Sequence, residues 1–120
     1  TVQGAYIDVK TGKVQFLGEH RAQQDLLEEG RPLDVVRTAS DPPVPPQEAL
    51  CSLVVGNRRY TKGGGGGQLE SYVLKALAGK GQLPAAVVLG CADSRAPVEI
   101  YFDMQPGDLF VLRTAGNTIE

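Results

Sequence analysis

The sequence is poor in the residues that build metal sites and disulfide frameworks. Its 120 residues include two cysteines, Cys51 and Cys91, a single histidine, His20, and no tryptophan. Two cysteines in a chain of this length do not make a disulfide framework, so a reducing compartment, such as the cytosol or a plastid stroma, is favoured. A zinc site takes three or four protein ligands, so this chain has few residues from which to build one alone.

An excess of charge of one sign and long hydrophobic runs are also missing. The chain carries 12 Lys and Arg against 14 Asp and Glu, and its formal net charge is -2. This balance argues against a nucleic acid or an anionic membrane as a partner. No apolar run approaches the roughly 20 residues of a membrane span. The first residues, TVQGAYIDVK, lack the pattern of a signal peptide.

Hairpin and loop signals dominate the first part of the chain. Residues 1–17 predict a β-hairpin, because two β-prone segments flank a KTGK turn. Residues 19–29 predict a helix, and residues 30–46 predict an extended connector with four prolines in SDPPVPPQ. Five consecutive glycines at 63–67 predict a flexible surface loop, since the Lys-Ser/Thr of a phosphate-binding loop is absent.

Two further helices are expected from apolar periodicity. Residues 47–60 place apolar side chains on one face after a run of prolines, and the Gly56-Asn57 pair is expected to end or bend this helix. Residues 68–78 carry a second apolar stripe, with Gly79 as the expected C-terminal stop.

The last third of the chain predicts strands of a parallel sheet. Residues 84–90 and 109–113 are short apolar runs of the kind buried on both faces of a sheet. A short helix from Pro97, over 97–104, and a Pro-Gly-Asp turn at 106–108 lie between them. Helices alternating with apolar strands indicate an α/β domain.

Polar residues gather where the first of these strands ends, in the segment LGCADSRAP. Sites in parallel sheets lie beyond the carboxyl ends of the strands, and TAGN leaves the second strand at the same edge. The Cys91 thiolate and the Asp93 carboxylate are both possible zinc ligands. Arg95 can pair with Asp93 through two parallel hydrogen bonds, which would keep the carboxylate ionised and either hold it off a metal or hold it ready for catalysis.

Simpler interpretations of the same residues stay open at this point. Cys91 can be a small core residue at the end of a buried strand. Asp93 or Ser94 can cap a helix while Arg95 is solvated. A redox thiol at Cys91 has little support, because the Cys-x-x-Cys pattern is absent.

The segment VVLGCADSRAPVEIYFDMQPGDLFVLRTAGN closely resembles the first half of the catalytic core of β-class carbonic anhydrases. The family's Cys-x-Asp-Ser-Arg, Pro-Gly-Asp and Ala-Gly-Asn elements correspond to residues 91–95, 106–108 and 115–117. Upstream, EALCSLVVGNRRY looks like the helix that precedes this core, so the resemblance spans about residues 47–120.

This resemblance implies a zinc enzyme, a lyase that reversibly hydrates carbon dioxide to bicarbonate. It implies that Cys91 is a zinc ligand and that Asp93 and Arg95 form the family's carboxylate–guanidinium dyad. In some members the corresponding Asp becomes the fourth zinc ligand, so the resemblance leaves open whether Asp93 coordinates zinc at rest.

The family's remaining zinc ligands, a His-x-x-Cys element, are not found in this chain. His20 is followed by RAQ and is expected to be solvated, and Cys51 is expected to be a core thiol in its helix. The missing ligands are therefore expected from outside the segment, on residues encoded after Glu120. The alternative is a catalytically inactive scaffold or assembly module with the carbonic anhydrase fold.

The resemblance also suggests an order of segments. Residues 1–17 resemble the last strands of a carbonic anhydrase, residues 18–46 would be a linker and N-terminal arm, and residues 47–120 the N-terminal half of the next core. The expected fold is thus a parallel-sheet core of the β-carbonic anhydrase type with flanking helices, incomplete in this chain, and an N-terminal hairpin. A tandem-repeat protein cut across a repeat boundary would give this order, as would a permuted or two-chain assembly. The expected partners are the missing half and a second unit, in a dimer or larger oligomer.

Overall fold

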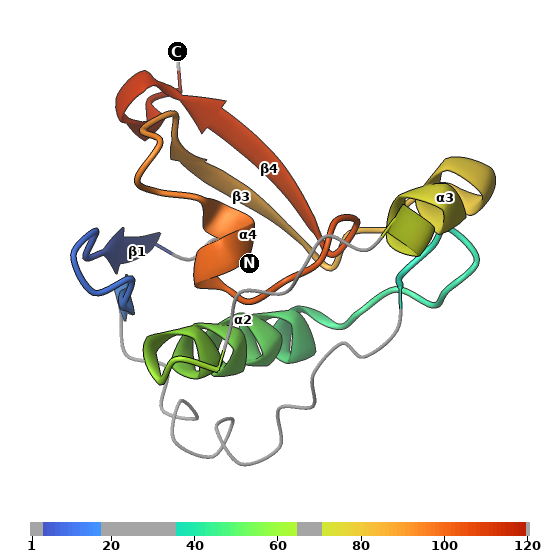
Figure 1. The fold of residues 1–120 in the computed structure, drawn as a ribbon, viewed down its shortest axis with the longest axis horizontal. Coiled ribbons are helices and arrows are strands. Elements are labelled where there is room, and N and C mark those ends of the chain that lie inside the picture. The colour runs from blue at the N-terminus through green and yellow to red at the C-terminus, as the bar shows by residue number, and fades with distance from the viewer. Residues whose placement is uncertain (1–3, 18–35, 65–70, 120) are drawn as a thin grey trace.

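The computed structural model describes residues 4–17, 36–64 and 71–119 (Figure 1). The helix predicted at 19–29, His20 and the glycines at 65–67 lie outside these residues. In the described part, no helix is both long and apolar enough to cross a membrane. The elements are β1 (Gly4–Ile7), β2 (Val14–Leu17), α2 (Pro46–Thr61), α3 (Ser71–Lys80), β3 (Ala86–Cys91), α4 (Val98–Tyr101), β4 (Leu109–Thr114) and the 3-10 turn η1 (Ala115–Asn117).

The α/β fold expected from the sequence is confirmed. Strands β3 and β4 pair in parallel, in a register that runs from Ala86 opposite Leu109 to Cys91 opposite Thr114. Strands β1 and β2 form the predicted antiparallel hairpin. In Figure 1, α4 lies between the β3–β4 sheet and α2.

One hydrophobic core joins these elements. Its buried members come from the hairpin, α2, α4 with the residue after it, and β4, and they are Val14, Leu53, Val98, Phe102 and Leu109. The sheet contributes one face to this core, through partly buried side chains of Ala86, Val88 and Val111. The hairpin is therefore packed on the same core as the parallel sheet.

The other face of the sheet is not covered by described residues. Val87 is 68% exposed, and Phe110 and Leu112 are 47% and 48% exposed. Strands of the kind buried on both faces of a complete sheet thus expose one apolar face in this chain, as expected for an incomplete core, because burial requires a second layer of structure over the sheet.

Helix α2 does not end at Gly56-Asn57 but continues to Thr61. Gly56 and Asn57 are both buried, on the part of α2 that contacts other elements. A Cβ atom at position 56 would lie 1.8 Å from the Phe102 carbonyl oxygen, so glycine is required where α2 meets the end of α4. Tertiary contacts thus account for a pair that local propensity assigns to a helix end.

The Asn57 side chain joins the hairpin to α4. Its Oδ1 accepts a hydrogen bond from the Val14 amide at 2.8 Å. Its Nδ2 donates to the carbonyl oxygens of Gly12, at 2.7 Å, and Tyr101, at 2.8 Å. The Asn57 amide therefore binds backbone groups of the hairpin and of α4, which are not hydrogen-bonded to each other in a sheet or a helix.

Helix α3 ends two residues later than the sequence predicted, at Lys80. Gly81, rather than Gly79, adopts the left-handed conformation, with φ of 73°, and its amide donates to the Leu77 carbonyl at 2.8 Å. This is the usual backbone geometry of a glycine C-cap.

We predict that replacing glycine by alanine has opposite effects on stability at Gly79 in α3 and at Gly56 in α2. Among the described residues, nothing lies within 4 Å of a Cβ atom added at Gly79, so Gly79→Ala should raise the free energy of unfolding by about 0.5–1 kcal/mol. Gly56→Ala should lower it by about 1–3 kcal/mol, because the methyl group meets backbone. Denaturant unfolding measures both, and stabilisation by both variants would contradict the close approach of α2 and α4.

Candidate functional site

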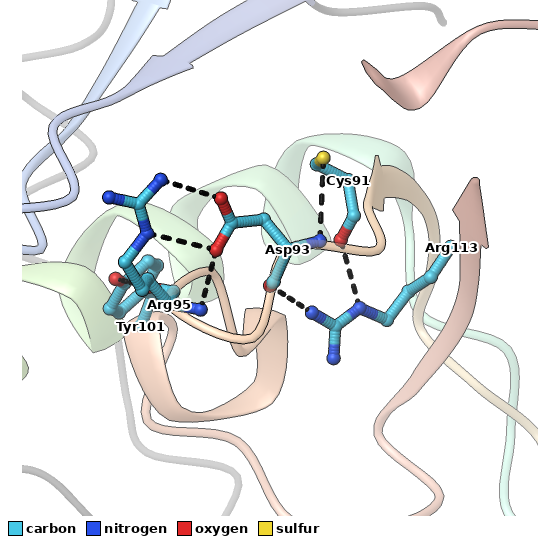
Figure 2. A network of polar contacts seen from close by, with 5 residues as sticks. All are labelled: Cys91, Asp93, Arg95, Tyr101 and Arg113. Carbon is cyan, nitrogen blue, oxygen red and sulfur yellow. Dashed lines mark hydrogen bonds and ion pairs between the residues drawn. The ribbon is translucent and has the colours of Figure 1, made fainter. Parts of the chain in front are cut away.

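The polar residues predicted from the sequence lie at the carboxyl ends of the two parallel strands (Figure 2). Cys91 ends β3 and is paired with Thr114, which ends β4. The turn η1 follows Thr114 directly and contacts β3. The expectation that the segments leaving both strands face one region is therefore confirmed.

Asp93 and Arg95 form the predicted two-point pair. Arg95 Nε donates to Asp93 Oδ1 at 3.1 Å, and an Arg95 Nη donates to Oδ2 at 2.7 Å. The Arg95 backbone amide also donates to Oδ1, at 2.8 Å. The guanidinium and amide bonds lower the pKa of Asp93 from 3.8 to about 2, and the carboxylate in turn raises the pKa of Arg95. Both groups are therefore charged at neutral pH.

This pair is not a helix cap. Helix α4 begins at Val98 with Pro97 in the cap position, and no side chain caps it. The interpretation of Asp93 or Ser94 as a capping residue is therefore wrong, because the Asp93 carboxylate bonds within its own turn instead.

Cys91 is partly exposed, so the structure does not make it a core residue. Its Sγ accepts a hydrogen bond from the Asp93 amide at 3.4 Å. That amide and those of Gly116 and Asn117 lower the pKa of the thiol, against the opposing effects of burial and of the Asp93 charge. Gly116 and Asn117 both have positive φ, 65° and 49°, in the turn that provides their amides. Successive amides converging on one atom are typical of anion-binding backbone turns, so they favour the thiolate.

Two residues of the site were not predicted from the sequence, Arg113 and Tyr101. Arg113 Nε donates to the Cys91 carbonyl oxygen at 2.9 Å, and its Nη donates to the Asp93 carbonyl oxygen. The Tyr101 hydroxyl donates to the Arg95 carbonyl oxygen. A basic residue at the end of the apolar run LFVLR was the available signal for Arg113, whereas nothing local distinguished Tyr101 from a core aromatic residue.

Cys91 and Asp93 carry side chains of the kinds that bind zinc, but two such residues do not make a complete set of ligands. A thiolate and a carboxylate are suitable zinc ligands, and backbone amides already favour the Cys91 thiolate. Both Asp93 oxygens accept hydrogen bonds from Arg95, which directs the carboxylate toward the guanidinium. The described residues contain no group of three or more His, Cys, Asp or Glu side chains that would hold a metal. Cys51, the other cysteine, is buried in α2.

Comparison with known proteins relates this chain to the carbonic anhydrases. The family model described as Carbonic anhydrase matches residues 86–120. The chain is 44% identical to Carbonic anhydrase 2 of Mycobacterium tuberculosis (strain ATCC 25618 / H37Rv) over 75 residues, which are 62% of this chain and 36% of the relative. It is 41% identical to the Carbonic anhydrase of Mycolicibacterium smegmatis with the same coverage, and 43% identical to that of Pseudomonas aeruginosa over 50 residues, 42% of this chain and 22% of the relative. The resemblance to β-class carbonic anhydrases is thus confirmed, and the chain spans about a third of the length of the curated relatives it matches.

We predict that Arg95→Gln raises the pKa of Asp93. The guanidinium bonds are the largest cause of the low value, so the pKa should rise from about 2 toward 3.8 without reaching it, because the amide bond at position 95 remains. The carboxylate then becomes protonated at higher pH as the solution is acidified. A carbon-detected NMR titration of the metal-free protein measures this shift. Arg58→Gln, at an exposed position of α2, is the control and should leave the Asp93 titration unchanged.

Proposed function

We propose, from the relationship of residues 86–120 to the carbonic anhydrases, that the protein catalyses the zinc-dependent, reversible hydration of carbon dioxide to bicarbonate. The observation that carries this proposal is the pairing of a partly exposed, thiolate-favouring Cys91 with an intact Asp93–Arg95 dyad at the ends of two parallel strands. Cys91 is the proposed zinc ligand from this chain, and Asp93 a conditional one. The remaining ligands are proposed to come from outside this segment.

Zinc, when bound, supplies a Lewis acid that makes water nucleophilic near neutral pH. The residues of this chain set the conditions for that chemistry. The backbone amides at Sγ lower the pKa of the Cys91 thiol and so favour the thiolate, the form that binds metal. Arg95 holds the Asp93 carboxylate by two hydrogen bonds, so the carboxylate would not be free to act as a ligand of a zinc ion bound at Cys91.

Asp93 is better suited to orient water than to take up a proton. A group with a pKa of about 2 is a poor general base at neutral pH, because a base works best when its pKa lies near the working pH. Asp93 Oδ1 accepts two hydrogen bonds from Arg95, whereas Oδ2 accepts one and still has a second lone pair. We therefore assign Asp93 the role of a fixed hydrogen-bond acceptor and Arg95 the role of holding it.

The proposed arrangement of segments follows the resemblance. Residues 1–17 are the terminal hairpin of a preceding unit, residues 18–46 a linker and N-terminal arm, and residues 47–120 the first half of a core. The exposed sheet face, with Val87, is where the missing half is proposed to pack. Further partners are a second unit, in a dimer or larger oligomer, and the substrates carbon dioxide and bicarbonate.

The proposed metal role predicts that Cys91→Ser removes zinc. A serine hydroxyl is a far weaker zinc ligand than a thiolate, so the full-length protein should lose its zinc, measured by elemental analysis, and its carbon dioxide hydration, measured by stopped flow. Cys51→Ser changes the other cysteine, which is buried in α2, and should retain both. Zinc content unaffected by Cys91→Ser, or no zinc in the parent protein, would contradict the proposal and favour an inactive scaffold.

The uncovered sheet predicts that the isolated 120-residue chain does not behave as a stable monomer. Contiguous exposed apolar strands associate with other surfaces, so sedimentation velocity should detect larger species. A Phe110→Ser/Leu112→Ser variant should associate less, because both side chains lie on the exposed face. A monomer that unfolds in a single cooperative thermal transition would disprove this expectation.

A further inference from the structure

The turn that carries the dyad is held by side chains from outside it. Asp93 and Arg95 lie between β3 and α4, in a stretch without helix or strand, and the Arg95 side chain is 71% exposed. Arg113 binds the backbone of this turn on the β4 side, through the carbonyl oxygens of Cys91 and Asp93. Tyr101 binds it on the α4 side, through the carbonyl oxygen of Arg95 (Figure 2).

Tyr101 is well placed to fix the turn, because the tyrosine is itself fixed. It is 4% exposed, and its ring lies 5.4 Å from the Tyr60 ring of α2, centroid to centroid. Its backbone carbonyl oxygen accepts the Asn57 hydrogen bond, at 2.8 Å. The residue is therefore held by packing at the ring and by a buried amide at the backbone, and its hydroxyl is the part directed at the turn.

The Asn57 side-chain amide also connects Tyr101 to the hairpin. Asn57 binds Gly12 and Val14 of the hairpin while it binds Tyr101 of α4. Hydrogen bonds therefore link Asn57 to the Tyr101 backbone and the Tyr101 hydroxyl to the Arg95 backbone, so that the buried amide is connected through Tyr101 to the residue that carries the exposed guanidinium. Each member of this line belongs to the described residues, and Asn57 and Tyr101 lie on helices α2 and α4.

We infer that Tyr101 is a positioning residue for the Asp93–Arg95 dyad and that Asn57 anchors it. The tyrosine hydroxyl sets the backbone of Arg95, and this backbone sets where the guanidinium meets the carboxylate. The inferred effect on turnover rests on the proposed function, whereas the effect on the geometry of the turn does not. Groups that orient a catalytic residue from one step away typically change activity by 10- to 100-fold when removed.

A double-mutant cycle tests this inference in the full-length protein. Tyr101→Phe removes the hydroxyl and keeps the ring, so kcat for carbon dioxide hydration should fall by about 10- to 100-fold. If the hydroxyl acts through Arg95, the same change in an Arg95→Ala background should cause no further fall. An equal fall in both backgrounds would overturn the inference, because it would show a general structural effect.

Tyr60→Phe is the matched control. It removes a hydroxyl from the neighbouring ring, which has no hydrogen bond to the dyad turn among the described residues. It should leave kcat unchanged and should unfold at the same midpoint as Tyr101→Phe. A loss of activity in both tyrosine variants would overturn the specific role of Tyr101.

A second measurement does not depend on activity. In the metal-free protein, the Arg95 Nε proton is held by Asp93, and Tyr101→Phe should increase its rate of exchange with solvent, observed by NMR. Unchanged exchange would overturn the inference even if activity fell. If the parent protein hydrates no carbon dioxide, the proposed function fails, and the exchange measurement still decides the positioning role of Tyr101.

Discussion

The structure depends on one buried side-chain amide, that of Asn57. It binds the backbone at Gly12, Val14 and Tyr101, which belong to a hairpin and a short helix that share no regular pairing. Without it, buried backbone groups would lose their partners, and each unsatisfied group costs about 1–3 kcal/mol. Gly56 completes the arrangement, because it lets α2 approach the Phe102 carbonyl oxygen closely.

The site inherits its geometry from this buried contact. Asn57 fixes the end of α4, and Tyr101 carries that position to the Arg95 backbone. Arg113 fixes the other side of the same turn from β4. An exposed charged pair is normally mobile and contributes little to stability. Here the pair sits on a backbone that two side chains hold, which is the condition that a preorganised site requires.

The pKa values of Cys91 and Asp93 are lowered by different partners, although the two residues lie only two positions apart. Backbone amides at Asp93, Gly116 and Asn117 favour the Cys91 thiolate. A guanidinium favours the Asp93 carboxylate. Their mutual repulsion would raise both pKa values, and these separate partners outweigh it. The described residues thus bring a thiol and a charged carboxylate–guanidinium pair together at one sheet edge, in a chain that spans about a third of its relatives' length.

Features that depend on neighbours along the chain could be predicted from the sequence. The apolar runs of β3 and β4 and the pairing of Asp93 with Arg95 follow from local pattern and a spacing of two residues. The roles of Asn57, Tyr101 and Arg113 depend on contacts between distant segments and are seen only in the folded chain. Asn57 suggested a helix end because its true partners lie 43 to 45 residues away. Local propensity contains no information about such contacts, because they exist only after the hairpin, α2 and α4 share one core.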